Sequence, residues 1–374
     1  MPSDFLTSAI SWLNNPQVQQ TLAPDLYHRL FGRVFGTPVT DGETISRLLD
    51  VPGEVSERER FFLYNFISTV WSGSKPILEL GPFLGASTKA IALGMLANPR
   101  FNHNVKFYTY DRFGAYYKPQ PLLKKLEPLT SRGALSDTLV SKLQAADETS
   151  LPDFLEIFNE IHSGEDYWNI LEVARSSLPG TRQREAETDN IFVADPSMEF
   201  EILFIDGCKS WYGTKYFMLE MCKCTKPGAF FLSQDYGWKS CFWLPAFWYV
   251  MKDCFQLVAN LDTTYMFQLV KPLDPERINS TFPDDPEQYS AEDYGKIFNL
   301  TIQEAANRCD MHGLVTAYLQ HVAALAYIGE KELARKILVQ LEREPFTKMN
   351  PYARWIKQSF DAPTYYPDGP NVTL

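Results

Sequence analysis

Residues 77–87 read Ile77-Leu78-Glu79-Leu80-Gly81-Pro82-Phe83-Leu84-Gly85-Ala86-Ser87, and this stretch decides the fold. A short apolar run suited to a buried strand leads into a turn with two glycines, and helical spacing begins near Thr88. In doubly wound α/β sheets, ligands bind at such turns, beyond the carboxyl ends of the strands. Gly81 and Gly85 let the backbone approach a ligand closely, while Ser87 and Thr88 leave N–H groups free for a carboxylate. A glycine pair alone also suits a purely structural turn.

From Ser72 to Lys271, short runs rich in branched and aromatic residues alternate with helical patterns, which is typical of βαβ units. The expected strands are Pro76–Leu80, Val105–Tyr110, Ile170–Ala174, Ile202–Ile205, Ala229–Leu232, Phe255–Leu261 and Met266–Val270, and the expected helices between them are Thr88–Leu96, Pro152–Ile161, Gly213–Met221 and Phe242–Lys252. The last two strands are too close for a crossover helix and should form an antiparallel edge hairpin. We therefore predict a Rossmann-like α/β fold with a mostly parallel seven-stranded sheet.

The remainder of the chain is divided by its composition. We expect an N-terminal helical extension at 1–71, the α/β domain at 72–272, a polar and proline-rich linker at 273–290, and a C-terminal helical region at 291–374. In the last region, Ala305–Ile328 and Lys331–Leu341 are expected to be two helices around Gly329. Such a hairpin would pack on the domain or on a second copy, so a homodimer through the helical extensions is an expectation.

Composition excludes several classes of protein. The 374 residues carry a formal net charge of −11 and no long basic run, which excludes the electrostatic footprint of a nucleic-acid binder. The most apolar late run, Cys241–Met251, is too short for a membrane helix, and the acidic start lacks the basic residues of a signal peptide. We expect a soluble, cytoplasmic protein that acts on a small molecule. The cysteines form no Cys-x2-Cys pair and are expected to be core thiols.

A second element follows the next predicted strand. Asp111 ends the run Val105–Tyr110, where a carboxylate can accept hydrogen bonds from both hydroxyls of a ribose. Arg112 beside it could lie against an adenine face, although exposed arginines are common. The alternative for Asp111 is a surface cap.

The third element comprises Phe204-Ile205-Asp206-Gly207-Cys208-Lys209-Ser210-Trp211-Tyr212-Gly213, then a helix, then Lys226-Pro227-Gly228-Ala229-Phe230-Phe231-Leu232-Ser233-Gln234-Asp235-Tyr236. With the first two elements, its order and spacing resemble class I S-adenosylmethionine-dependent methyltransferases. The resemblance covers Ile77 to Val270 and is greatest to the group of macrocin-, mycinamicin- and novobiocin-type sugar O-methyltransferases. It implies S-adenosylmethionine as the cofactor.

The resemblance also implies roles for particular residues. Asp111 would hold the ribose and Asp206 would lie near the reacting centre. Ser176 would stand near the adenine, although Arg175-Ser176-Ser177 departs from the usual small residue and acid. Together with Thr88 and Arg112 from the residue patterns above, the full expected cofactor set is Glu79, Gly81, Gly85, Ser87, Thr88, Asp111, Arg112, Ser176 and Asp206.

Two replacements alter the part of the site that would bind the methyl acceptor, which we call the acceptor half. Metal-dependent relatives use Asp-Gly-Asp and a later Asp-Asp pair, but here Cys208 and Gln234 each replace one of these acids. Asp206, Asp235 and the Gln234 amide would leave a sparse magnesium site. Lys209 stands where relatives often carry histidine. It could serve as the base that removes the acceptor proton, or form a salt bridge with Asp206 or Asp235.

Aromatic rings crowd the ends of the fourth and fifth expected strands and suit the face of a ring or sugar. The residues expected to contact the substrate are Trp211, Tyr212, Asp235, Tyr236 and Trp238. We expect O-methylation of a hydroxyl in a natural product or sugar. A nicotinamide-dependent oxidoreductase is a rival, but its Gly-x-Gly-x-x-Gly is absent. A second rival is a catalytically altered protein that serves as a binding or assembly partner.

Overall fold

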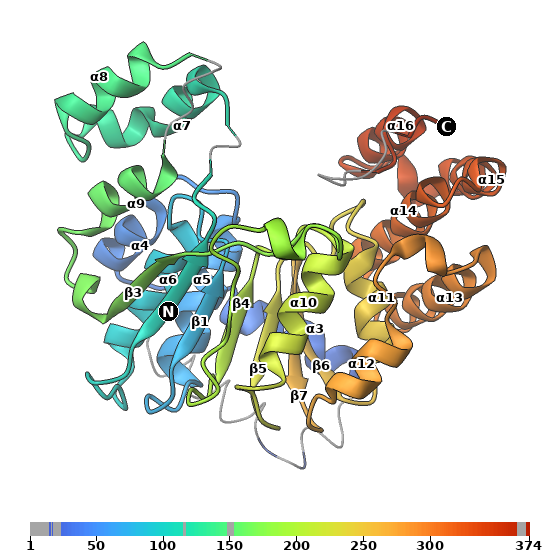
Figure 1. Cartoon of the computed structure of the whole chain (residues 1–374), viewed down its shortest axis with the longest axis horizontal. Coiled ribbons are helices and arrows are strands. Elements are labelled where there is room, and N and C mark those ends of the chain that lie inside the picture. The colour runs from blue at the N-terminus through green and yellow to red at the C-terminus, as the bar shows by residue number, and fades with distance from the viewer. Residues whose placement is uncertain (1–14, 16, 18–23, 115–116, 148–152, 365–371) are drawn as a thin grey trace. The chain divides into compact units, whose positions relative to one another are not determined.

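The computed structural model describes residues 15, 17, 24–114, 117–147, 153–364 and 372–374 (Figure 1). Its strands are β1 (Ile77–Leu80), β2 (Phe107–Asp111), β3 (Leu171–Arg175), β4 (Ile202–Ile205), β5 (Phe230–Ser233), β6 (Phe255–Leu261) and β7 (Thr264–Leu269). They form a seven-stranded sheet in the order β3-β2-β1-β4-β5-β7-β6. All seven expected strands are confirmed, with boundaries within two residues of those predicted.

The sheet contains both kinds of strand pairing. β1 pairs in parallel with β2 and with β4, and β2 pairs in parallel with β3. β7 is antiparallel to both β5 and β6, so the predicted edge hairpin is confirmed. The fold is therefore the predicted Rossmann-like α/β sheet. The strand order reverses at β1, where β1 connects outward to β2 and β4 lies on its other side, and such a switch point is where these sheets bind ligands.

Apart from residues before Leu30, the chain divides into two compact units. The first comprises Leu30–Ser177 and Phe200–Gly207, and the second comprises Leu178–Glu199 and Cys208–Leu374. The first unit holds β1 to β4, and the second holds β5 to β7.

Several helices of the first unit begin at strong capping residues. Asp41 caps α4 (Gly42–Leu49), and Ser56 forms a capping box with Glu59 at the start of α5 (Glu57–Thr69). The remaining helices of this part are α6 (Ala86–Ala97), α7 (Pro119–Ser131), α8 (Asp137–Ala145), α9 (Phe154–His162) and the 3-10 turn η1 (Trp168–Ile170). α3 (Pro24–Phe35) precedes them and crosses the boundary between the units. The expected helix Thr88–Leu96 is thus confirmed as α6, with two more residues at its start.

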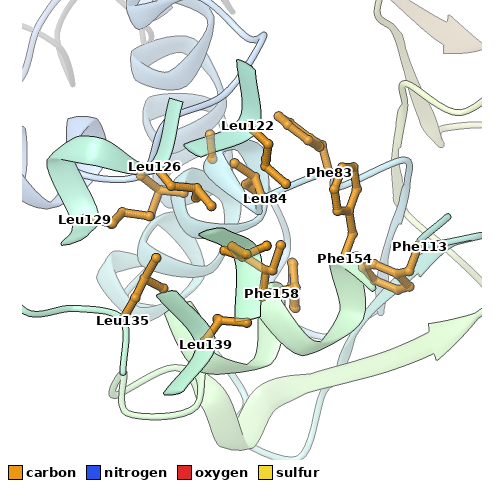
Figure 2. Packing of buried hydrophobic residues seen from close by; sticks show 14 residues of the cluster. Phe83, Leu84, Phe113, Leu122, Leu126, Leu129, Leu135, Leu139, Phe154 and Phe158 are labelled. Atoms are coloured by element: carbon orange, nitrogen blue, oxygen red, sulfur yellow. The ribbon is translucent and has the colours of Figure 1, made fainter. Parts of the chain in front are cut away.

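The sequence reading did not predict α7 and α8, a helical hairpin between β2 and β3 (Figure 1). Its leucines Leu122, Leu126, Leu129, Leu139 and Leu143 are buried in one cluster with Phe83 and Leu84 of the turn after β1. Figure 2 shows Phe83 beside Phe154 and Leu84 facing the leucines of α7. The hairpin is therefore packed directly on the glycine-containing turn.

The second unit begins with η2 (Glu185–Glu187), α10 (Trp211–Met221) and α11 (Trp243–Val250) and ends in helices. Those helices are α12 (Pro275–Thr281), η3 (Pro286–Gln288), α13 (Ala291–Asn307), α14 (Met311–Tyr327), α15 (Lys331–Glu342), η4 (Pro345–Lys348) and α16 (Tyr352–Asp361). The segment expected to be a linker thus contains α12 and η3. The single helix predicted for Ala305–Ile328 was wrong, because Cys309 has a φ of 50° and Asp310 caps a new helix at Met311.

Two further expectations concern membranes and thiols. Among the described residues, no helix combines the length and the apolar character that crossing a membrane requires. All six cysteines are free thiols, and Cys208, Cys224, Cys241 and Cys254 are buried. The expected core thiols are confirmed, except that Cys222 is half-buried and Cys309 is exposed.

Candidate functional site

The turn after β1 brings three chain segments of the first unit together. Gly81 has a φ of 88°, and a Cβ atom there would lie 2.8 Å from the Asp206 carbonyl carbon and 2.8 Å from the Gly207 nitrogen. Its N–H donates to the Tyr110 carbonyl at 2.9 Å. Only glycine suits this position, both for its conformation and for the space. The ends of β1, β2 and β4 are thus in close backbone contact.

Gly85 is fixed by a residue that the sequence reading missed. The buried His162 ring of α9 lies so close that a Cβ at Gly85 would be 2.0 Å from its Nε2. His162 Nε2 donates to the Leu84 carbonyl at 2.9 Å, and Nδ1 accepts from the Tyr167 hydroxyl at 2.8 Å. Burial lowers the pKa of His162 to about 4, so the ring is neutral at physiological pH. His162 lies 78 positions from Leu84 in the sequence, and no local pattern marks it.

Glu79 lies at the centre of the turn and is fully buried. Ser87 Oγ donates to one of its oxygens at 2.6 Å, and Thr88 Oγ1 and Thr109 Oγ1 donate to the other at 2.6 and 2.9 Å. Burial raises the pKa of Glu79 to about 7, although these three hydrogen bonds oppose the shift. The carboxyl group therefore ties β1 and β2 to the first turn of α6.

The side chains of Ser87 and Thr88 are buried and turned towards Glu79. Their backbone N–H groups belong to the first turn of α6, which follows Gly85 as its N-cap without a side-chain cap. N–H groups in a first turn have no carbonyl partner within their own helix. They are the groups that the sequence assigns to a ligand carboxylate.

Asp111 ends β2 and is half-buried. Its Oδ1 accepts from the Phe113 N–H at 2.6 Å, and its carbonyl accepts from the Ser176 N–H at 2.7 Å. Ser176 is buried, whereas Arg112 is exposed and its carbonyl accepts from Arg175. The structure thus brings Asp111 and Ser176 together at neighbouring strand ends.

The second unit holds the acceptor-side residues. Lys209 Nζ donates to Asp235 Oδ2 at 2.5 Å, with the two side chains 39% and 23% exposed. Of the two alternatives for Lys209, the structure contains the salt bridge, with Asp235 as its partner. Asp235 has a φ of 62°, a left-handed conformation that non-glycine residues adopt only when their surroundings enforce it.

Two of the aromatic residues expected to contact substrate are enclosed by the second unit. The Trp211 ring is fully buried, stacks on Phe282 at 4.2 Å between ring centroids, and donates from Nε1 to the Pro283 carbonyl. The Tyr212 hydroxyl donates to Glu185 and accepts from Arg182. These contacts occupy both rings. Sequence spacing could not reveal them, because the partners come from distant segments.

Tyr236 and Trp238 are half-buried on the loop after β5. The Tyr236 ring lies 4.5 Å from that of Tyr265, and the Trp238 ring packs edge-on against Trp355 of α16. A polar pocket of about 670 Å³ lies elsewhere in this unit, between Arg182, Lys215 of α10 and residues 279–289. None of the five expected substrate residues lines it.

The residues proposed for magnesium do not fit a metal site. Asp235 already accepts the ammonium of Lys209, and a second cation beside it would be repelled. Gln234 keeps one buried oxygen without a hydrogen-bond partner, but its amide nitrogen donates to Thr263. Nowhere in the described ranges do three or more His, Cys, Asp or Glu side chains form a group that could hold a metal.

Comparisons with known proteins find structures of similar fold at low sequence identity. No family model matches the chain, and no curated protein matches it. An O-methyltransferase from Bacillus cereus in complex with SAH is similar over 67% of this chain and 100% of its own, with 14% identity and a TM-score of 0.37. A calicheamicin methyltransferase is similar over 71% and 91%, with 11% identity and a TM-score of 0.34. Likeness of this size does not assign the chain to a family.

Proposed function

We propose that this chain binds S-adenosylmethionine and transfers its methyl group to a hydroxyl of a small molecule, such as a natural product or sugar. The observation that carries the proposal is the convergence at Gly81, where a side chain would collide with the Asp206–Gly207 backbone. The first turn of α6 and the acids Glu79, Asp111 and Asp206 lie at the strand ends around Gly81. This supports a site for a ligand that carries an amino acid and a ribose.

Each group has a role suited to its environment. The first-turn N–H groups of Ser87 and Thr88 would bind the methionine carboxylate, because a helix N-terminus favours negative charge. Glu79 would face the methionine ammonium, which stabilises the ionised form of a buried carboxyl. Asp111 would accept from the ribose hydroxyls, and Ser176, with Arg112 outside it, would border the adenine.

When bound, S-adenosylmethionine supplies a methyl group that passes to the acceptor oxygen by in-line displacement at the sulfonium. The chain must orient the acceptor, exclude water and receive the hydroxyl proton. Lys209 is held as an ammonium by Asp235, and an ammonium has three donors but no lone pair to accept a proton. We therefore assign Lys209 to donation towards the acceptor oxygen and Asp206 to acceptance of its proton.

The acceptor would lie beside the loop after β5. Asp235, Tyr236 and Trp238 are partly accessible and would contact the acceptor. Trp211 and Tyr212 are buried and would support the site without touching the acceptor. A buried tryptophan stacked on a second ring holds the start of α10, and with it Lys209, in a fixed position.

Calorimetric titration with S-adenosylhomocysteine and with NADH tests the cofactor. We expect S-adenosylhomocysteine to bind and NADH not to bind. Asp111→Ala should weaken the binding about 10–100-fold, because two ribose hydrogen bonds to a charged group are lost. Asp195→Asn is the control. Asp195 caps a turn in the second unit through a hydrogen bond from Ser197, so this variant should bind S-adenosylhomocysteine as tightly as the unchanged chain does. Binding of NADH alone would refute the proposal in favour of the oxidoreductase.

Turnover with a panel of hydroxyl acceptors tests the chemistry. Lys209→Met and Asp206→Asn should each lower kcat about 100-fold or more. Lys209→Arg keeps the cation and should retain more activity than Lys209→Met, whereas a base would be lost equally in both. Lys223→Met, which removes an ion pair with the buried Glu220, is the control. Normal turnover in both Lys209→Met and Asp206→Asn would refute these roles. Cofactor binding without any turnover would favour the assembly partner.

A further inference from the structure

The loop after β5 is held by helix α14 through three successive carbonyl groups. Gln320 Nε2 donates to the carbonyls of Tyr236 and Trp238 at 2.7 and 2.8 Å, and His312 Nε2 lies 3.1 Å from the carbonyl of Gly237. Both protons of one buried amide are used, which fixes its orientation. The side chain of Gln320 is 1% exposed, so no water competes for these bonds.

The start of α14 is itself fixed to the edge hairpin. Asp310, which caps α14, accepts from the Tyr265 hydroxyl of β7 at 2.6 Å and from the Asn260 amide of β6 at 3.0 Å. A Cβ at Gly313 would lie 2.3 Å from the Asp310 carboxylate, so any side chain at position 313 would displace that carboxylate. The carbonyls of the loop are therefore bound to a rigid support.

The loop so held begins with Asp235, which has a φ of 62° and carries the carboxylate that pairs with Lys209. A left-handed conformation is unfavourable for a residue with a Cβ atom, and it persists where neighbouring contacts impose it. The three carbonyls that α14 contacts belong to the three residues that follow Asp235 in the chain.

We propose that Gln320 is a positioning residue that keeps the Asp235 carboxylate in reach of Lys209. Helix α14 would then contribute to the part of the site that binds the methyl acceptor. This inference rests on the proposed function, in which the acceptor half orients the methyl acceptor. It assigns α14 a role in the proposed chemistry.

Gln320→Met tests the inference, because methionine has a similar length and no N–H donor. Amide exchange by mass spectrometry reports on the loop through the amides of Gly237, Trp238 and Cys241, whose acceptors are the carbonyls of Thr263, Asp235 and Trp238. We expect their exchange to become about tenfold faster or more, since two buried hydrogen bonds are lost. Leu319→Ala, at the adjacent buried position of α14, is the control for simple loss of helix packing.

A second readout is the rate at which an amine-acylating reagent modifies Lys209 relative to Lys223. Asp235→Asn defines the effect of losing the partner and should accelerate the modification of Lys209. Gln320→Met should accelerate it in the same direction by about twofold or more, and Leu319→Ala should not. If Gln320→Met does not fold, His312→Phe removes the neighbouring contact and is measured in the same way.

Equal loop exchange in Gln320→Met and Leu319→Ala, or an unchanged Lys209 rate in Gln320→Met, would overturn the inference. The dissociation constant of S-adenosylhomocysteine should stay within about twofold of the unchanged chain, because its proposed ligands lie in the first unit. If the unchanged chain does not bind S-adenosylhomocysteine at all, the proposed function fails while both loop readouts still judge the positioning role.

Discussion

Glu79 is a carboxyl group enclosed by three hydroxyl donors and no cation. Burial raises its pKa from 4.5 to about 7, so in the folded chain it holds its proton up to neutral pH. The unfolded chain releases that proton near pH 4.5. The contribution of Glu79 to stability is therefore fully present below pH 4.5 and is lost as pH rises through 7.

Glu79→Gln should remove this pH dependence. An amide keeps partners for the hydroxyls of Ser87, Thr88 and Thr109 and does not ionise. Between pH 5 and pH 8, the free energy of unfolding of the unchanged chain should fall relative to the variant by about 2.5 kcal/mol. Urea denaturation of both proteins at the two pH values measures the difference. Parallel pH profiles would show that Glu79 is ionised throughout.

His162 should act on the cofactor through the turn and not through direct contact. His162→Leu removes the donor to the Leu84 carbonyl, so we expect S-adenosylhomocysteine to bind about tenfold more weakly. His162→Gln keeps an N–H donor and should lose less. His321→Leu is a matched control, since His321 is a buried histidine of α14 whose pKa burial also lowers to about 4. Equal losses in the two leucine variants would contradict a specific role for His162.

At the scale of elements, α7 and α8 are helices that the sequence reading did not predict. The segment 119–131 contains Pro119, Pro121 and Pro128, and prolines normally argue against a helix. The first two lie in the opening turn, where the missing N–H costs nothing, and Pro128 is accommodated inside the helix. Leu122, Leu126 and Leu129 recur at helical spacing and pack in one cluster with Phe83 and Phe158, so a local signal is present and the prolines obscure it.

The strands, by contrast, followed from local patterns, because a buried parallel strand is a continuous apolar run bounded by turn residues. The sequence also predicts where the proposed cofactor residues lie, since Gly81 and Asp206 directly follow a strand and Asp111 ends one. The burial of Trp211 and the support from His162 and Gln320 depend on residues far away in sequence. Periodicity carries no information about them.

Phe83→Gly tests how strongly the hairpin is attached to the turn. Phe83 has a φ of 52°, so glycine would relieve about 1–3 kcal/mol of backbone strain. The ring, however, is buried between Tyr117 and Phe154, and its removal costs about 3–5 kcal/mol. The loss of packing is larger, so urea denaturation should show net destabilisation of about 2 kcal/mol. Asn190→Gly, at an exposed position with a φ of 50°, should be neutral or slightly stabilising. Phe83→Gly as stable as the unchanged chain would mean that the ring adds nothing.

At the scale of the whole molecule, the proposed ligands of the methyl donor and the Lys209–Asp235 pair fall in different compact units, with Asp206 in the first of them. The proposed ligands of the methyl donor lie in Leu30–Ser177 and Phe200–Gly207, while Lys209, Asp235 and the helices behind them lie in the second unit. That second unit has its own core among α14, α15 and α16, built around Leu319, Leu338 and Trp355. A partial opening of these helices would leave every proposed cofactor ligand in place.

Amide exchange with and without S-adenosylhomocysteine should therefore be uneven along the chain. A ligand at 100 times its dissociation constant stabilises whatever must unfold to release it by about 2.7 kcal/mol, or about 100-fold in exchange rate. We expect slowing of that order in β1, β2 and α6, because their opening disrupts the site. Amide exchange in α15 and α16 should change little, because these helices can unfold locally without disrupting the proposed ligand site, and bound ligand does not oppose such an opening. Equal slowing in both units would show that the chain unfolds only as a whole.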